Sequence, residues 1–358
     1  MRKVTRYIKI HPLHPQKKYI RFAARVLLAG GTVAFPTETV YGLGANALDG
    51  AAVEKIFLAK RRPGDNPLIV HVARREELDR LVTRVPAQAE RLIDLFWPGP
   101  LTLILPRSWA VPDQVTAGLD TVAVRMPRHP VALALIRAAG VPVAAPSANL
   151  SGKPSPTSGL HVLRDLAGRV NLVLDGGRAE VGLESTVLDL TGDCPLILRP
   201  GGVSREELEQ VLGQVALDPA LAQDHSGLLK PRSPGLKYTH YAPAARVFVI
   251  RAALPERLPE ALVRLVRRAR TRGKRVGLLL TAETAREFIR QKIQPDYLEV
   301  MGSRNRPQEI AARLFEALRN CDRHRLDLVY AESIPEKGIG LAVMNRLLKA
   351  AGYRVIRL

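Results

Sequence analysis

The chain has 358 residues, of which 46% are hydrophobic and 25% are charged, so it is long enough for two globular domains. Its 54 Lys and Arg residues against 34 Asp and Glu residues give a formal net charge of +20. This excess favours a polyanionic partner or substrate, or reflects only solubility and an arginine-rich proteome. No apolar run approaches the ~20 residues of a membrane span, and the basic start lacks the apolar core of a signal peptide. Cys194 and Cys321 lie far apart, which argues against a disulfide scaffold or a thiolate zinc site. We therefore expect a cytoplasmic protein without a membrane partner.

The first part of the chain mixes strands with helices. Helices are expected over residues 15–29, 51–62, 75–96 and 129–140, the first ended by a glycine pair. A glycine-rich corner is expected over residues 40–50. Apolar β-branched runs predict strands over residues 32–39, 68–72, 101–106, 121–127, 141–149, 172–177, 185–190 and 196–202. This pattern predicts a twisted α/β sheet for residues 1–213.

Residues 214–243 are rich in proline and glycine and have no sustained periodicity, so we expect an interdomain linker. From residue 244 to 358 the pattern changes to strict alternation. Strands are expected at 246–250, 275–280, 297–302, 326–332 and 353–358, with a helix in each of the four intervals. Five strands with intervening helices predict a parallel, doubly wound, Rossmann-like domain.

Several catalytic signatures are absent from the sequence. It has no phosphate-binding G-x-x-x-x-G-K-[ST] loop, no dinucleotide fingerprint after a strand and no H-E-x-x-H, C-x-x-C or G-x-S-x-G motif. Serine-nucleophile and zinc chemistry therefore have no support, and we expect no metal site built from protein ligands.

Polar residues instead gather in loops at the ends of the predicted strands, where open α/β sheets bind ligands. Their guanidinium, ammonium, hydroxyl and amide groups suit phosphates and carboxylates. Individually, Ser and Asn cap turns, Arg199 can pair with an acid, and cations at 60–62 suit a helix C-terminus. Arg125 stands out, because a guanidinium within an apolar strand requires an anion. The set is Thr37, Thr39, Tyr41, Lys60, Arg62, Asn66, His71, Thr121, Arg125, Ser147, Asn149, Ser151, Lys153, Ser155, Ser185 and Arg199.

Seven ordered blocks resemble those of the YrdC-like threonylcarbamoyl-AMP synthases. They are "PTETVYGLGANA", "KRRPGDNPLIVHV", "FWPGPLTLIL", "TVAVRMPRHP", "PVAAPSANLSGKPSPT", "ESTVLDL" and "LRPGG". Lys60 and Arg62 match the family's K-x-R signature, and Ser147 and Asn149 match its S-x-N signature. The resemblance covers residues 15–212 and continues through "SPGLKYTHYAP" into the smaller C-terminal domain, as in the two-domain form of the enzyme.

The resemblance implies the fold, the reaction and the roles of the residues. The fold would surround a basic concave cavity. L-Threonine, bicarbonate and ATP would give L-threonylcarbamoyladenylate and pyrophosphate, with Mg²⁺ carried by ATP, and the product would pass to a tRNA threonylcarbamoyl transferase. Catalytic roles would fall on the two signature pairs. Threonine contacts would fall on Thr39, His71, Arg125, Ala145 through its backbone, and Ser185. ATP contacts would fall on Lys60, Arg62, Asn66, Thr121, Ser147, Ser155, Arg199 and one of Tyr238 and Tyr241.

Two alternatives remain open, and a third is excluded by the cysteine count. A double-stranded RNA or tRNA binding protein would explain the charge, and "RLVRRARTRGKR" could contact a nucleic-acid backbone. A hydrogenase-maturation carbamoyltransferase contains a similar domain, but it would need zinc-finger cysteine pairs that this chain lacks. The C-terminal domain could also serve only to dock a partner.

Overall fold

The computed structural model describes residues 4–221 and 241–358, which divide into two compact units. The described part of the first unit is residues 4–151 and 155–221, and that of the second is residues 152–154 and 241–358. Within residues 4–221 and 241–358, none of the helices is long and apolar enough to cross a membrane. The predicted linker lies mostly outside these residues. Its first part pairs with the first unit, because β11 (Ala216–Leu217) runs parallel to β10 (Leu196–Arg199).

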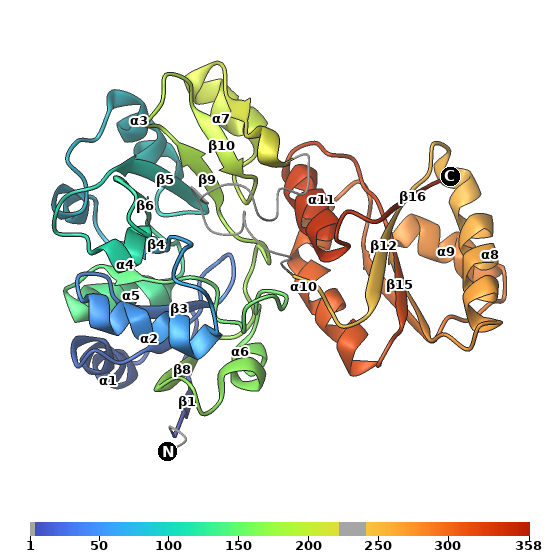
Figure 1. Ribbon diagram of the computed structural model, residues 1–358, viewed down its shortest axis with the longest axis horizontal. Helices are drawn as coiled ribbons and strands as arrows, with labels where there is room; N and C mark the ends of the chain where they lie inside the picture. Colours follow the sequence, from blue (N-terminus) through green and yellow to red (C-terminus); the bar gives the residue numbers. More distant parts are fainter. Residues whose placement is uncertain (1–3, 222–240) are drawn as a thin grey trace. The chain divides into compact units, whose positions relative to one another are not determined.

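The first unit is built on a mixed sheet (Figure 1). Among the described residues its strand order is β1-β8-β2-β3-β7-β4-β6-β5-β9-β10-β11. The remaining strands are β1 (Arg6–Lys9), β2 (Val33–Phe35), β3 (Gly42–Asn46), β4 (Ile69–His71), β5 (Leu101–Pro106), β6 (Thr121–Arg125), β7 (Val143–Ala144), β8 (Leu172–Asp175) and β9 (Thr186–Asp189). The helices are α1 (Lys17–Leu28), α2 (Gly50–Lys60), α3 (Ala87–Phe96), α4 (Asp113–Thr116), α5 (Pro130–Ala139), α6 (Gly159–Leu166) and α7 (Arg205–Leu212), with 3₁₀ turns η1 (Arg75–Arg80) and η2 (Pro219–Leu221).

Both faces of this sheet are covered, as alternation along single strands shows. In β2, Val33 and Phe35 join the apolar cluster that contains α1 and α5, whereas Ala34 joins the cluster on the other face with Ile56 of α2. Successive strand residues point to opposite faces, so burial of all three requires a layer of side chains on each side. The predicted α/β sheet is confirmed.

The glycine-rich segment expected as a corner forms strand β3 instead. A Cβ on Gly44 would lie 2.6 Å from Val143 Cγ1 and 2.7 Å from Phe35 Cε1. Glycine is therefore required at this position by close packing within the sheet, not by a turn. The predicted strand over residues 32–39 is correspondingly short and ends at Phe35, because residues 36–41 form the loop that leads into β3.

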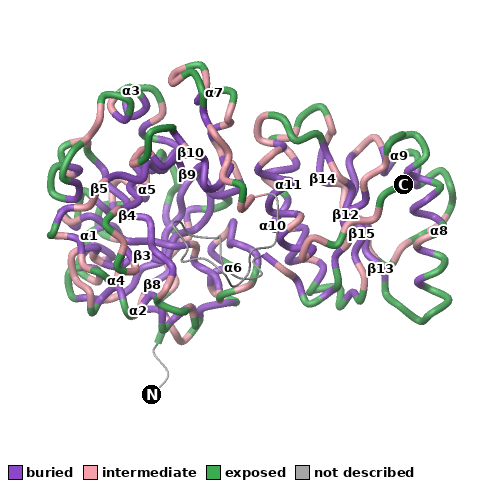
Figure 2. The backbone as a smooth tube through the Cα atoms, turned by 45° about the horizontal axis from the view of Figure 1, so that its top comes forward, coloured by how far each residue is buried: buried purple, intermediate pink, exposed green. Residues whose placement is uncertain are grey.

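The second unit is a parallel, doubly wound sheet, as predicted from the alternating pattern. Its strand order is β14-β13-β15-β12-β16, and α8 packs on α9 while α10 packs on α11, on opposite faces (Figure 1). Figure 2 shows the central strands β13 and β15 buried and exposed residues along α8 and α9, whereas α11 has no exposed residue. The strands are β12 (Arg246–Arg251), β13 (Val276–Thr281), β14 (Tyr297–Gly302), β15 (Leu328–Glu332) and β16 (Val355–Arg357). The helices are η3 (Pro255–Arg257), α8 (Leu258–Arg270), α9 (Ala282–Arg290), α10 (Pro307–Arg323) and α11 (Ile339–Ala350).

Candidate active site

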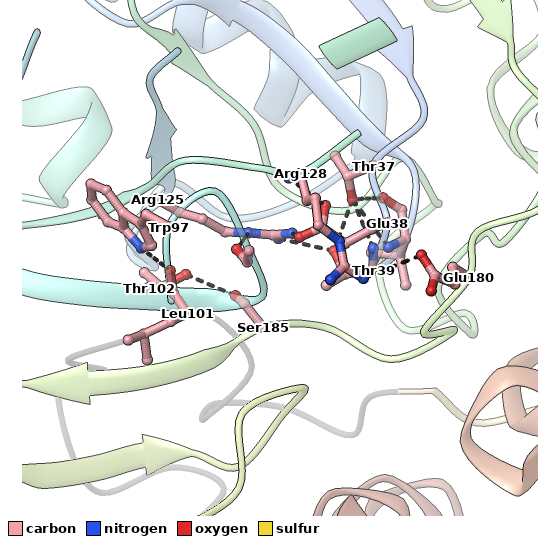
Figure 3. A network of polar contacts seen from close by, with 12 residues as sticks. Thr37, Glu38, Thr39, Trp97, Leu101, Thr102, Arg125, Arg128, Glu180 and Ser185 are labelled. Atoms are coloured by element: carbon pink, nitrogen blue, oxygen red, sulfur yellow. Dashed lines mark hydrogen bonds and ion pairs between the residues drawn. The ribbon is translucent and has the colours of Figure 1, made fainter. Parts of the chain in front are cut away.

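Arg125, the last residue of β6, is buried in a network of polar contacts (Figure 3). Its Nη2 donates to Glu38 Oε1 at 2.6 Å, its Nη1 to Thr39 Oγ1 at 2.9 Å and its Nε to the Gly99 carbonyl at 3.0 Å. A guanidinium carries five N–H groups, so two remain without an acceptor among residues 4–221 and 241–358. The anion that the sequence required is therefore supplied by the protein, and Arg125 still has donors available for a ligand.

Glu38 lies in the loop between β2 and β3, and sequence analysis did not assign it a role. It is 3% exposed, and its second oxygen, Oε2, accepts the Arg128 backbone N–H at 3.1 Å. Thr37 fixes the loop, because its hydroxyl lies 2.8 Å from Thr39 Oγ1 and donates to the Val40 carbonyl at 2.6 Å. The signal for Glu38 was the same as that for Arg125, an ionisable residue between buried strands.

His71 ends β4 and occupies the register position paired with Arg125 on the adjacent parallel strand. Burial, together with the positive charge of Arg125, lowers the pKa of His71 to about 3, so the ring is neutral near pH 7. Its buried Nδ1 has no hydrogen-bond partner among the described residues. A ring nitrogen in this state can accept from a ligand or donate to one.

Ser185 and Arg199 are in direct contact. Arg199 donates from Nε to the Ser185 carbonyl at 3.1 Å and from Nη2 to Ser185 Oγ at 3.2 Å, and Ser185 Oγ lies 2.7 Å from Thr102 Oγ1. The following glycine makes this approach possible, because a Cβ on Gly201 would lie 2.2 Å from the Ser185 carbonyl carbon. The sequence assigned Ser185 to threonine and Arg199 to ATP, so these two predicted subsites would adjoin here.

Lys60, for which an ATP contact is predicted, bonds a loop of the protein. It is buried in the last turn of α2, and its Nζ donates to the Ser147 carbonyl at 2.5 Å, the Asn149 carbonyl at 2.7 Å and Asn149 Oδ1 at 3.3 Å. An ammonium has three N–H donors, and these contacts account for all of them. Lys60 of the K-x-R signature thus holds the loop that carries the S-x-N signature. Within that loop, Ser147 Oγ donates to Asn149 Oδ1 at 2.5 Å.

Arg62 and Asn66 lie in the loop that connects α2 to β4. Arg62 is half-buried and its Nη2 donates to the Asn66 and Pro67 carbonyls at 3.0 and 3.2 Å. The buried Oδ1 of Asn66 has no hydrogen-bond partner in the part of the chain that the structure describes. Arg61 is exposed and caps α2 with a positive φ of 52°, which agrees with its interpretation as a solvated cation.

The remaining predicted ligand contacts, Thr121, Ser155 and Ala145, differ in burial and in hydrogen bonding. Thr121 is half-buried at the start of β6, and buried Ser155 donates to Glu184 Oε1 at 2.6 Å. The Ala145 N–H already donates to the Ile69 carbonyl at 2.9 Å, so a backbone contact with threonine would use the Ala145 carbonyl.

The structure does not support the predicted ATP contact by either linker tyrosine, Tyr238 or Tyr241. Tyr238 lies outside the described residues. Tyr241 is 6% exposed in the second unit, and its ring centroid lies 5.0 Å from that of Phe315. This packing gives no support to an ATP contact by Tyr241.

No group of three or more His, Cys, Asp or Glu side chains that could hold a metal ion occurs among residues 4–221 and 241–358. The site has buried donors at strand ends, and two buried carboxylates, Glu38 and Glu184, orient their neighbours. This arrangement is typical of an α/β enzyme that positions anionic substrates.

Comparison with known proteins identifies the family. Residues 25–201 match the family described as Telomere recombination, and residues 203–352 match the threonylcarbamoyl-AMP synthase C-terminal domain. The threonylcarbamoyl-AMP synthase of Bacillus subtilis is 51% identical over 336 residues, 94% of this chain and 93% of its own length. The crystal structure of Pyrococcus abyssi Sua5 complexed with L-threonine matches with a TM-score of 0.91 and 46% identity, over 99% of this chain and 100% of its own. Escherichia coli YciO matches with a TM-score of 0.51 and 30% identity, over 55% of this chain and 96% of its own. The chain belongs to the threonylcarbamoyl-AMP synthase family, in the form with the additional C-terminal domain.

Proposed function

We propose that this chain makes L-threonylcarbamoyladenylate and pyrophosphate from L-threonine, bicarbonate and ATP, and that Arg125 binds the threonine carboxylate. The observation that carries the proposal is the pair of Arg125 N–H donors left over after Glu38, Thr39 and Gly99 are bonded. A carboxylate matches a guanidinium better than it matches any neutral donor in this network.

The chemistry requires anions to be brought together. Threonine's amine combines with bicarbonate to form a carbamate with loss of water, and a carbamate oxygen then attacks the α-phosphorus of ATP and displaces pyrophosphate. Carbamate, carboxylate and triphosphate repel one another in water, so fixed cations and donors lower the barrier by positioning and charge compensation. No protein nucleophile is needed. Neutral His71 and the hydroxyls of Thr39 and Ser185 would contact threonine without adding charge.

ATP would bind beside the threonine subsite. Its contacts are assigned to Arg62, Asn66, Thr121, Ser147, Ser155 and Arg199. Lys60 would act through the loop it holds, with Asn149 as the link between them. The contact of Ser185 with Arg199 supports adjoining subsites. Mg²⁺ would arrive with ATP and be held mainly by phosphate oxygens, because Mg²⁺ in such sites is shared between few protein ligands and the phosphates.

Two further assignments complete the proposal. The product is a mixed anhydride that hydrolyses, so it would be consumed by a tRNA threonylcarbamoyl transferase soon after release. The compartment would be the cytoplasm, and the exposed free thiol of Cys194 is compatible with a reducing environment.

The test is pyrophosphate release from ATP with threonine or bicarbonate omitted in turn. Release that needs both substrates supports the synthase activity, and release without either indicates a general ATPase or nucleotidyl transferase. Arg125→Lys keeps a cation for Glu38 but loses the forked donor, so we expect the KM for threonine to rise ~10–100-fold. Arg128→Gln removes an exposed guanidinium nearby and is the matched control. An unchanged KM in Arg125→Lys would contradict the assignment.

A weak contact with tRNA is a second and separate proposal, which rests on α8. This helix and the turn after it expose seven cations within residues 264–275: Arg264, Arg267, Arg268, Arg270, Arg272, Lys274 and Arg275. Their density suits a phosphate backbone. Arg267→Gln with Arg270→Gln should reduce the salt dependence of tRNA binding by about two phosphate contacts. A salt dependence unchanged in that variant would exclude this surface.

A further inference from the structure

The second unit contains a cavity at the carboxyl ends of its parallel strands. Its volume is about 220 Å³, and the residues around it include Ile250 of β12, Leu258 of α8, Glu332 of β15 and Arg304, which follows β14. β12 and β15 are neighbours in the sheet, and the helices that follow them, α8 and α11, lie on opposite faces. This is a switch point of a doubly wound sheet, the place where such sheets bind ligands.

Arg304 is the charged donor of this cavity. Its Nη2 donates to Glu332 Oε1 at 2.6 Å and to Thr284 Oγ1 at 3.0 Å, and the side chain is 26% exposed. Its Nε and Nη1 have no acceptor among residues 4–221 and 241–358, which leaves at least three N–H groups available. The Ser333 hydroxyl also lines the cavity and has no hydrogen-bond partner within the same residues. These groups can bind an anion.

Glu332 is buried and is held by four hydrogen bonds within the protein, which restrict its contact with a ligand. Its oxygens accept from the Thr281 N–H at 2.8 Å, Thr281 Oγ1 at 3.1 Å, Thr284 Oγ1 at 2.9 Å and Arg304. Three of these contacts fall on Oε1 and one on Oε2, and the side chain is 2% exposed, so burial restricts the approach of an amino acid's ammonium group to Glu332. Glu332 also accepts from Thr281, the N-cap of α9, so its negative charge lies beside the helix N-terminus where a nucleotide phosphate would otherwise bind.

The size and the walls of the cavity limit the ligand further. A volume of about 220 Å³ is below the 300–1,000 Å³ of pockets for drug-sized ligands, so it fits a molecule of roughly ten non-hydrogen atoms or fewer. Ile250, Leu258 and Ile334 form an apolar wall, and Arg304 is the one cation among the described residues that line the cavity. A single guanidinium beside an engaged carboxylate matches a monoanion better than a phosphate dianion.

We propose that this cavity is a second ligand site, for a small monocarboxylate with an aliphatic tail, whose carboxylate binds Arg304 and Ser333 and whose tail packs on Ile250, Leu258 and Ile334. The site is independent of the synthase reaction, because it uses residues of the second unit alone. A ligand here would act on the C-terminal domain without competing for threonine or ATP.

The experiment is ligand-observed NMR or calorimetry on the full chain, with isovalerate as the probe and L-threonine in excess to occupy the first site. L-Valine has the same tail with an added ammonium, 3-methylbutanamide lacks the charge, and inorganic phosphate lacks the tail. We expect saturable isovalerate binding, and at least about tenfold weaker binding of each of the other three.

Variants locate the site. Arg304→Gln removes the donor and Ala252→Leu fills the cavity from its rim, and each should weaken isovalerate binding at least about tenfold while the chain stays folded. The control is Arg306→Gln, which removes an exposed guanidinium two residues away. Absence of isovalerate binding up to about 20 mM, or binding unaffected by Ala252→Leu and Arg304→Gln, would overturn the proposal. Equal binding of L-valine or phosphate would overturn the ligand class.

Discussion

Each unit places an arginine–glutamate pair at the carboxyl ends of parallel strands, and the two pairs differ in which partner the strand carries. In the first unit Arg125 ends strand β6 and Glu38 comes from a loop; in the second unit Glu332 ends strand β15 and Arg304 comes from a loop. The shortest N–O distance is 2.6 Å in both. Arg125 is 4% exposed, whereas Arg304 is 26% exposed.

This difference shows how burial decides what an ion pair can do. A guanidinium buried on a strand is fixed on several sides, and a ligand meets it in one orientation only, which suits catalysis by positioning. A guanidinium on a loop, partly in solvent and anchored through one nitrogen atom, can adapt to its ligand. The same kind of contact is therefore proposed to serve a reaction site in one unit and a simpler binding site in the other.

The largest expected effect is that of Glu38→Gln. The substitution leaves Arg125 buried without its counterion, and breaking a buried pair in this way costs about 3–5 kcal/mol of unfolding free energy. Both tryptophans, Trp97 and Trp109, lie in the first unit, so their fluorescence during urea unfolding reports that unit alone. Glu180→Gln, which removes one partner of an exposed pair, should cost at most about 1 kcal/mol. Equal losses in the two variants would refute the role given to burial.

Lys60→Met tests whether a buried cation acts through another loop. The change leaves the carbonyls of Ser147 and Asn149 without their donor, and each buried unsatisfied group costs about 1–3 kcal/mol. We expect kcat to fall more than the KM for threonine changes, because the S-x-N loop is displaced while Arg125 is intact. Steady-state kinetics measures this split. A rise in the KM for ATP alone would instead favour direct contact of Lys60 with phosphate.

The stability of the two units should depend differently on pH. The pKa of His71 is about 3 in the folded chain and about 6.5 in the unfolded chain, so below pH 6.5 the unfolded state binds a proton that the native state does not. The first unit should lose up to about 2 kcal/mol between pH 6.5 and pH 5. In the second unit, desolvation raises the pKa of Glu283, but hydrogen bonds from Ser303 and Arg304 outweigh it and lower the pKa to about 2, so the stability it contributes is lost only as the pH falls from about 4.5 toward 2.

The measurement is urea unfolding at several pH values, followed by tryptophan fluorescence for the first unit and by circular dichroism for both. In His71→Gln the fluorescence midpoint should depend less on pH. The dependence that remains is assigned to His129, whose pKa is lowered by burial. A midpoint equally pH-dependent in His71→Gln would exclude His71 as the cause.

Among the substitutions of buried residues, the smallest loss of stability is expected for Glu332→Gln. Arg304 is partly exposed and can be hydrated once its carboxylate partner is lost, so we expect about 1–2 kcal/mol rather than the loss predicted for Glu38→Gln. Circular dichroism should detect the change while tryptophan fluorescence does not. A loss as large as that of Glu38→Gln would mean that exposure of the arginine does not reduce the cost.

Much of the architecture could be predicted from local pattern. Strict alternation of strands and helices after residue 244 predicted the parallel sheet, since each period and each break is a local property of the chain. The strands of the first unit were harder to predict from local sequence pattern. β1 (Arg6–Lys9) has no apolar alternation and owes its conformation to pairing with β8. β3 has glycines that local rules assign to turns, although packing against Phe35 and Val143 requires them.

The sequence by itself determined the family, the kinds of residue at the site and the need of Arg125 for an anion, because motifs and the cost of a buried charge can be read without coordinates. Only the tertiary structure decided that Glu38 is that anion, that Lys60 holds the loop of Ser147 and Asn149, and that Arg304 and Glu332 meet beside a cavity. These partners are separated by 87, 87 to 89, and 28 residues along the chain. No local pattern specifies which distant groups become neighbours, because that depends on the order in which strands assemble into the sheet.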